Sequence, residues 1–154
     1  MKRLPAVKVR IKDLVEGKFY QGEKEKMKPS YILTPFGQKI SRVNIFGTVI
    51  DKFISEDESY AFLTLNDFSG AIRVKFFRDD VEKVKDVEIG KNVVIIGRVK
   101  VWNGEIYVNG EIIREIDDPN FESYRKLEIL KSLIEFKKNL NEIKRLKEVL
   151  SEEE

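Results

Sequence analysis

The sequence predicts a mainly β protein, a five-stranded barrel followed by a long C-terminal α-helix. Between Arg42 and Ile113, five segments alternate apolar and polar residues with a period of two, which is typical of strands with one buried face. The dipeptide Asn103-Gly104 separates the last two segments and favours a tight hairpin turn. Beyond Pro119 the apolar residues recur at spacings of three and four, which indicates a helix.

The first strand of the barrel is expected over residues 42–50. Alternation places Val43, Ile45 and Val49 on its core side. Gly47 lies in the middle of this strand, where a glycine costs stability. We therefore expect a sharp bend or a close backbone approach at that position.

The second and third strands are expected at residues 60–65 and 72–77, joined by a turn at residues 67–70. The third strand directs one set of side chains away from the core: Arg73, Lys75 and Phe77. Two cations and an aromatic ring on one surface suit a groove for single-stranded nucleic acid. An ordinary solvated strand face could carry the same residues, and this strand alone favours neither interpretation.

A short helix is expected over Asp79–Val87, with Asp79 or Asp80 as its N-cap. The long apolar segment Asn92–Trp102 and its hairpin partner Glu105–Ile113 then complete five strands. The order β-β-β-α-β-β is that of the OB fold, a partly open Greek-key barrel that commonly binds oligonucleotides. In that fold Trp102, at the hairpin tip, would overhang the groove, although it could also plug the end of the barrel.

Composition excludes several classes of function. The 154 residues include neither cysteine nor histidine, so disulfides, thiol nucleophiles and imidazole catalysis are not available. The acidic pairs Asp79-Asp80 and Asp117-Asp118 could hold Mg²⁺, but both lie where helix N-caps are expected, and capping explains them without a metal. We expect no enzymatic activity, no cofactor and no metal.

No apolar run is long enough to cross a bilayer, so we expect a cytoplasmic, nucleoid-associated protein without membrane contact.

The net charge of +2 is unevenly distributed along the chain. Residues 1–50 carry 11 basic and 4 acidic side chains, whereas residues 51–118 carry 10 basic and 15 acidic ones. Binding to nucleic acid must therefore depend on where individual cations lie rather than on overall basicity.

We expect the chain to have four parts. Residues 1–38 form an N-terminal extension packing on the barrel, and residues 39–118 form the barrel itself. Residues 119–150 form an assembly helix, and residues 151–154 form an acidic tail.

The C-terminal helix is expected from Pro119, with Asp118 as N-cap, and nothing interrupts it before Leu150. Its apolar stripe comprises Ile129, Leu133, Phe136, Leu140, Ile143 and Leu150. A helix of about 30 residues is about 45 Å long, more than the barrel can cover. We therefore expect a partner helix, with packing onto its own barrel or a homodimeric coiled coil as the alternatives.

Together these segments resemble the barrel-plus-helix subunits of replication protein A, a heterotrimeric single-stranded-DNA-binding protein. The similarity is to its middle or smallest subunit and extends to the related subunit of the telomere-capping CST complex. The resemblance is carried, in order along the chain, by residues 42–49, 62–70, 72–79, 97–102 and the helix from Phe121. The family's middle subunit often continues into a winged-helix domain, which this sequence does not include.

The resemblance implies roles for particular residues. In that family, bases stack on an aromatic residue at the end of the third strand and on another at the hairpin tip, here Phe77 and Trp102. Lys75 takes the position of a basic groove residue. The last helix of the family forms a three-helix bundle, so the resemblance implies two partner subunits in addition to single-stranded DNA.

The other predicted site residues are weaker candidates. Arg73, Arg42 and Arg98 could neutralise phosphates. Packing against the N-terminal segment is the favoured interpretation for Tyr107, Phe46 and Phe62. Two other functions stay open: a structural subunit whose groove is filled by its own N-terminal segment or faces a partner, and the anticodon-binding module of a tRNA synthetase.

Overall fold

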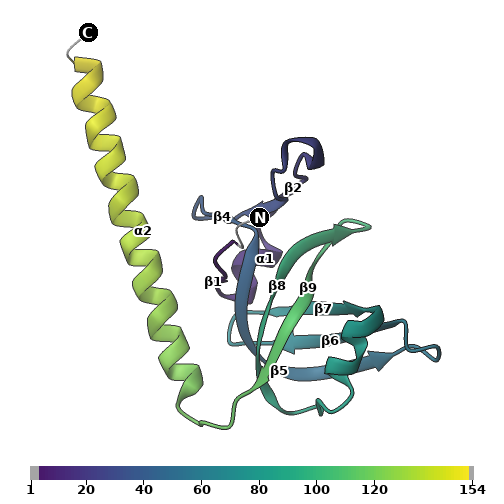
Figure 1. The fold of residues 1–154 in the computed structure, drawn as a ribbon. Coiled ribbons are helices and arrows are strands. Elements are labelled where there is room, and N and C mark those ends of the chain that lie inside the picture. The colour runs from purple at the N-terminus through teal and green to yellow at the C-terminus, as the bar shows by residue number, and fades with distance from the viewer. Residues whose placement is uncertain (1–3, 153–154) are drawn as a thin grey trace. The chain divides into compact units, whose positions relative to one another are not determined.

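The structure, a computed structural model, describes residues 4–152. Five strands form its barrel, in the order in which the sequence predicts them (Figure 1). They are β5 (Arg42–Ile54), β6 (Tyr60–Asn66), β7 (Ala71–Phe77), β8 (Asn92–Trp102) and β9 (Glu105–Glu115).

The barrel closes because β5 pairs with two strands. Residues Arg42–Thr48 lie antiparallel to β8, and residues Thr48–Ile54 lie antiparallel to β6, with a register irregularity after Val49. β7 pairs antiparallel with β6. β9 lies between β7 and β8, parallel to β7 and antiparallel to β8. The order β5-β6-β7-β9-β8, returning to β5, is a five-stranded Greek-key barrel of the OB type. The predicted fold class is confirmed.

The core contains the residues that alternation assigned to it. Val43, Ile45 and Val49 of β5 are fully buried, as is Phe76 of β7, the largest of the fully buried side chains. The same cluster includes Leu63 and other inward residues of all five strands. This alternation leaves the opposite faces of β6, β7 and β9 free to carry the candidate site.

The N-terminal segment contributes a short helix to this core. Ile11 and Leu14 of α1 (Ile11–Val15) are fully buried. The backbone N–H of Ile11 donates to Asp67 Oδ2 and that of Lys12 to Ser69 Oγ, both at 3.0 Å. The first N–H groups of a helix have no partner within the helix. The turn between β6 and β7 therefore both reverses the chain and holds α1 in place.

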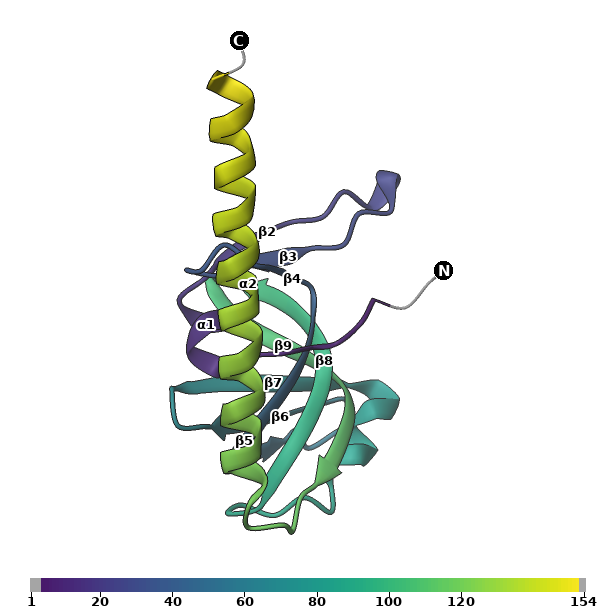
Figure 2. The same ribbon diagram turned by 90° about the vertical axis from the view of Figure 1, so that its left-hand side faces the viewer.

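The remaining N-terminal elements are short. β1 pairs in parallel with β5, and the next three strands form a separate small sheet (Figure 2). These elements are β1 (Val7–Lys8), β2 (Lys18–Tyr20), the 3-10 helix η1 (Lys24–Lys26), β3 (Tyr31–Leu33) and β4 (Lys39–Ile40).

The helix between β7 and β8 differs from the prediction. It is a 3-10 helix, η2 (Arg78–Val84), with Phe77 in the N-cap position and no side-chain capping bond. The chain leaves β7 through a left-handed conformation at Arg78, with φ of 54°, and the helix begins there rather than after Asp79. Asp80 instead pairs with Lys83 at 2.9 Å. The prediction that Asp79 or Asp80 caps this helix is wrong.

The β8–β9 hairpin turns at the predicted dipeptide. Asn103 and Gly104 both have positive φ, 50° and 76°, as a type I′ turn requires. Trp102 and Glu105 pair across the turn, which places the indole at the tip of the hairpin.

The helix α2 (Phe121–Glu152) belongs to a second compact unit, which begins at Asn120. The backbone N–H of Tyr124 donates to the carbonyl of Asn120 at 3.1 Å, so Asn120, and not Asp118, occupies the N-cap position. Both residue types are good caps, and the helix begins two residues later than Pro119 predicts. Among the described residues, no helix combines the length and the apolar character that crossing a membrane requires.

Two glycines in the barrel strands allow the packing of the barrel to be tested. A Cβ at Gly97 would lie 2.3 Å from the carbonyl oxygen of Asn109, whereas one at Gly47 would come no closer than 3.1 Å to Leu65. We expect Gly97→Ala to lower the free energy of unfolding by about 1 to 3 kcal/mol because the paired strand β9 must move. Gly47→Ala should cost less, since only small shifts are needed. Urea unfolding monitored by circular dichroism checks this, and equal midpoints for the two variants would contradict it.

Candidate nucleic-acid interface

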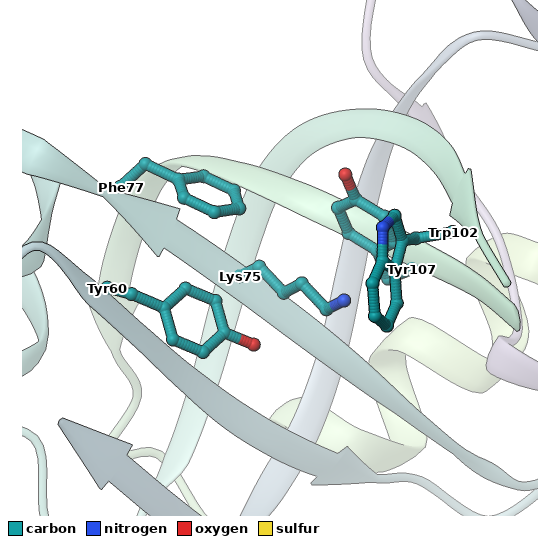
Figure 3. Close-up of a pocket in the computed structure, with 5 residues that line it drawn as sticks. All are labelled: Tyr60, Lys75, Phe77, Trp102 and Tyr107. Atoms are coloured by element: carbon teal, nitrogen blue, oxygen red, sulfur yellow. The ribbon is translucent and has the colours of Figure 1, made fainter. Parts of the chain in front are cut away.

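A hollow of about 430 Å³ lies on the outer face of the barrel. Its lining residues come from four different strands and are Tyr60, Lys75, Phe77, Trp102 and Tyr107. Figure 3 shows Tyr60 and Phe77 at one end of the hollow, Tyr107 and Trp102 at the other, and the Lys75 side chain reaching toward the second pair. Four rings therefore surround one cation.

Lys75 is held by aromatic faces. Its Nζ lies 4.1 Å from the ring centroid of Tyr107 and 5.3 Å from that of Trp102, both within the range of cation–π attraction. The residue is only 9% exposed, yet no carboxylate within residues 4–152 pairs with it. Its charge is therefore not neutralised by the described part of the chain.

Phe77 and Tyr60 face each other across the β6–β7 pair. The two residues are register partners, and their ring centroids are 5.4 Å apart at an angle of 37°. Burial raises the pKa of the Tyr60 hydroxyl, and the nearby charge of Arg73 offsets part of that rise. Burial also raises the pKa of Tyr107. Both phenols are therefore neutral at physiological pH and present uncharged, hydrogen-bonding edges to the hollow.

The aromatic surface continues beyond the hollow along β6 and β5. Phe62 stacks on Phe53, with centroids 5.4 Å apart and ring planes 22° apart. The guanidinium of Arg73 lies 4.6 Å from the Phe62 centroid. Arg73 is thus exposed on the predicted face of β7 but does not line the hollow.

Arg42 and Arg98 lie together elsewhere on the barrel. They are register partners on β5 and β8, and both guanidinium groups approach Glu111, with Nε to Oε1 distances of 3.4 and 3.9 Å. Arg42 is only 8% exposed and also donates to the carbonyl of Leu4 at 3.1 Å. Neither residue lines the hollow. Their contact with phosphates stays a prediction.

Sequence reasoning missed part of this site. Tyr60 was not a candidate, although register could have found it, because it pairs directly with Phe77. The expectation that Tyr107 and Phe62 only pack against the N-terminal segment is wrong, since Tyr107 contacts Lys75 and Phe62 contacts Phe53. Trp102 does not plug the barrel, because it is 64% exposed.

The hollow offers binding surfaces rather than reactive groups. Within residues 4–152, no group of three or more histidine, cysteine, aspartate or glutamate side chains is placed to hold a metal ion. The flat faces of four rings and one ammonium group can stack planar ligands and attract anions. Unstacked bases joined by phosphates combine both properties.

The helix α2 carries the stripe predicted for assembly on one side of its 32 residues. Its later members, Leu140, Ile143 and Leu150, are exposed. Solvent-exposed leucine and isoleucine repeating on one helical face over several turns is the pattern of a helix that packs against another. The assembly interface on this face stays a prediction.

Comparison with known proteins agrees with this geometry. Residues 43–116 match the family described as tRNA_anti-codon, OB-fold nucleic acid binding domain. No protein of curated function matches the sequence significantly.

Solved structures extend the likeness to nearly the whole chain. A chain of the S. pombe Stn1–Ten1 complex is 23% identical, with a TM-score of 0.68 over 92% of this chain and 95% of that one. A chain of a replication protein A heterotrimer bound to single-stranded DNA is 13% identical, with a TM-score of 0.69 over 86% and 98%. A chain of yeast replication protein A bound to single-stranded DNA is 26% identical, with a TM-score of 0.61 over 82% and 88%.

The matched shares of 92% and 86% exceed residues 1–119, which precede the second unit, so the likeness includes the barrel and at least part of the helix. The resemblance predicted from the sequence is therefore confirmed at the level of fold. The chain contains an OB-fold barrel, which matches the family of OB-fold nucleic acid binding domains over residues 43–116, followed by a long helix, and it is similar in structure to subunits of replication protein A and of the Stn1–Ten1 complex.

Proposed function

We propose that this chain is an OB-fold subunit of a replication-protein-A-like heterotrimer that binds single-stranded DNA during replication, repair and recombination. It binds rather than catalyses, and it acts on nucleoid DNA. Residues 1–38 support the barrel, residues 39–118 bind the strand, and residues 119–150 assemble the complex, followed by an acidic tail at 151–154.

Lys75 is the observation that carries the DNA-binding proposal. Removing a cation from water is costly, and proteins usually match a largely buried cation with a carboxylate. Lys75 is instead placed among rings, in a hollow open to solvent, with no carboxylate among its described contacts. A phosphate or a base carbonyl entering the hollow would supply the missing partner.

The rings supply the rest of the binding energy. Bases stack on Phe77 and Trp102, which are 41% and 64% exposed, while Lys75 and Arg73 neutralise phosphates, with Arg42 and Arg98 as weaker contributors. Stacking tolerates every base, so little sequence preference is expected. Duplex DNA binds much more weakly, because its bases are already stacked on one another.

The helix α2 joins two other subunits in a three-helix bundle. Its stripe, Ile129, Leu133, Phe136, Leu140, Ile143 and Leu150, forms the contact surface. Support comes from the exposed later members of the stripe and from similar chains that belong to complexes of several subunits. The competing functions are a purely structural subunit and an anticodon-binding module. Substitution of the rings in the hollow distinguishes both from the proposed function.

The groove is tested by substituting its rings. Phe77→Ala and Trp102→Ala should each weaken binding of a labelled oligothymidine by about 1 to 3 kcal/mol, because one base loses its stacking partner. Lys75→Ala should lower the dependence of affinity on salt by about one unit of log–log slope. Fluorescence anisotropy on the chain alone and on the assembled complex measures both effects.

Phe68→Ala is the matched control. Phe68 is 42% exposed, close to the 41% of Phe77, but it lies in the β6–β7 turn at the other end of the hairpin. Its substitution should leave affinity unchanged. If both ring variants bind as the parent does in the complex, the chain is a structural subunit. Preference for a tRNA anticodon stem-loop over oligothymidine would favour the anticodon-binding function.

The assembly role is tested on the helix. Leu133→Glu combined with Leu140→Glu should abolish association with the partner subunits, because two carboxylates would be buried in the bundle. The barrel should stay folded, since its core cluster is built from residues between Val9 and Val108. Size-exclusion chromatography with light scattering measures association, and circular dichroism measures the fold.

Lys131→Glu combined with Lys138→Glu is the control for charge. These positions lie two residues from the stripe members, on the other side of a helix with 3.6 residues per turn. This variant should assemble normally. Co-purification of the Leu133/Leu140 variant with the partner subunits would show that the helix is not the assembly element.

A further inference from the structure

The small sheet of β2, β3 and β4 lies outside the barrel strands and has two different faces. On one face, Ile32 and Ile40 are buried and Phe19 packs against the barrel core. These three residues are register neighbours across the sheet, so alternation turns the residues beside them to the opposite side. The residues of this outward face are Lys18, Tyr20, Tyr31, Leu33 and Lys39.

Tyr20 and Tyr31 form a parallel stack on the outward face. They are register partners, with ring centroids 5.2 Å apart and ring planes 17° apart. The Nζ of Lys39 lies 5.1 Å from the Tyr31 centroid, and Lys39 belongs to β4, on the other side of β3 from Tyr20. Tyr31 is therefore covered on both sides. Tyr20 belongs to the edge strand β2 and is 41% exposed, so the stack ends in one open ring face.

The cations of the outward face have no carboxylate beside them. Lys18 and Lys39 pair in register with Leu33 from its two sides, so both lysines lie in one row of the sheet. Both are exposed, and the described part of the chain gives neither of them an acidic partner. Residues 18–40 contain five lysines and two glutamates. This face is therefore positively charged and available to anions.

The segment between β2 and β3, residues 21–30, carries further lysines next to the stack. The N–H of Gly22 donates to Ser30 Oγ at 2.9 Å, and the N–H of Lys28 donates to the carbonyl of Glu23 at 3.1 Å. A Cβ at Gly22 would lie 2.1 Å from the carbonyl oxygen of Lys28, so the two sides of this segment are in contact. Figure 1 and Figure 2 both show it projecting away from the barrel.

We propose that the outward face of the small sheet is a second nucleic-acid-binding site, separate from the barrel. One base of a single strand stacks on the open face of Tyr20, and neighbouring phosphates bind Lys18 and Lys39. The site shares no residue with the hollow. The inference deepens the proposed DNA-binding function and rests on it, because it assigns the N-terminal segment a contact with the same strand.

Single-stranded nucleic acid fits this face better than a protein segment does. A ring stack with one open end suits a planar base, and cations without carboxylates suit phosphates. An apolar peptide would bury the lysines without a counter-charge, which is costly. An acidic peptide would match the charge but would bring no planar group to Tyr20. Duplex DNA keeps its bases stacked on one another and has none to offer.

The test uses the full chain and oligothymidines from about 4 to about 32 nucleotides, the longest being about twice the upper site size of an OB fold. Tyr20→Ala should bind the shortest oligomers as the parent does, since these fit in the hollow alone. It should bind the longest about five-fold or more weakly, the loss of one stacked base. Lys18→Gln should lower the log–log salt slope by about one unit for the longest oligomers only.

A second background keeps the two sites apart. In the double variant Phe77→Ala, Trp102→Ala, the hollow has lost both stacking rings. Adding Tyr20→Ala to this variant should still weaken binding of the longest oligomers about five-fold or more, because the sheet contributes its own contact.

Two controls separate stacking from folding. Tyr20→Phe keeps a flat ring and should retain the affinity of the parent at every length. Phe36→Ala removes a ring of similar exposure, 48%, from the turn between β3 and β4. The cation nearest that ring is Arg10, at 5.9 Å, and Asp13 neutralises it at 2.7 Å, so Phe36→Ala should have no effect. Thermal unfolding of each variant identifies any loss that comes from the fold.

The outcomes distinguish this inference from the function on which it rests. Binding by Tyr20→Ala that follows the parent at every length overturns the second site and leaves the hollow intact, including the case in which this face binds a protein. A loss of equal size at every length also overturns it, because Tyr20 would then act through the fold or the hollow. If Tyr20→Ala loses affinity for long oligomers while Phe77→Ala and Trp102→Ala bind as the parent does, the sheet site holds and the hollow is overturned. No binding of oligothymidine by the parent, alone or in complex, overturns the proposed function and this inference with it.

Discussion

The candidate site depends on the double pairing of β5. Because one strand closes the barrel against both β8 and β6, the side chains of every barrel strand have a fixed inside and outside. A register shift of one residue would exchange the two faces. Phe76 would then leave the core, and Lys75 would enter it. The packing around Phe76 and the position of the neighbouring cation on the outer face of the strand are therefore consequences of the same constraint.

Local patterns predicted most of the fold. Alternation identified the buried residues of β5 and β7, and Asn103-Gly104 identified the hairpin turn, because both signals depend on the chain's immediate neighbours. The errors occurred at element ends. The start of η2 depends on the left-handed conformation of Arg78, and the start of α2 on a choice between two capping residues. Neither is fixed by composition alone.

The sequence predicted part of the site. The remaining residues could be identified only from the register in which the strands pair. Phe77 and Lys75 follow from alternation within one strand, whereas Tyr60 and Tyr107 reach the hollow from strands paired with it. For two predicted arginines, the structure reveals an acidic neighbour that the sequence did not predict. Arg42 and Arg98 are cations on the outer faces of β5 and β8, but Glu111 approaches both of them, which no count of charges in the sequence reveals.

Local placement of charge reconciles a modest net charge with the proposed nucleic-acid surface. The segment that contains the barrel has more acidic than basic residues, yet many of these charges are paired, such as Lys85 with Glu58 and Glu82. Lys75 and Arg73 lie on ring faces instead, where a cation is stabilised without a carboxylate. An aromatic surface thus keeps positive charge available to phosphates at close range. Because opposite charges attract strongly only over about a Debye length, the attraction of such a surface for phosphates depends on where these cations lie rather than on overall basicity.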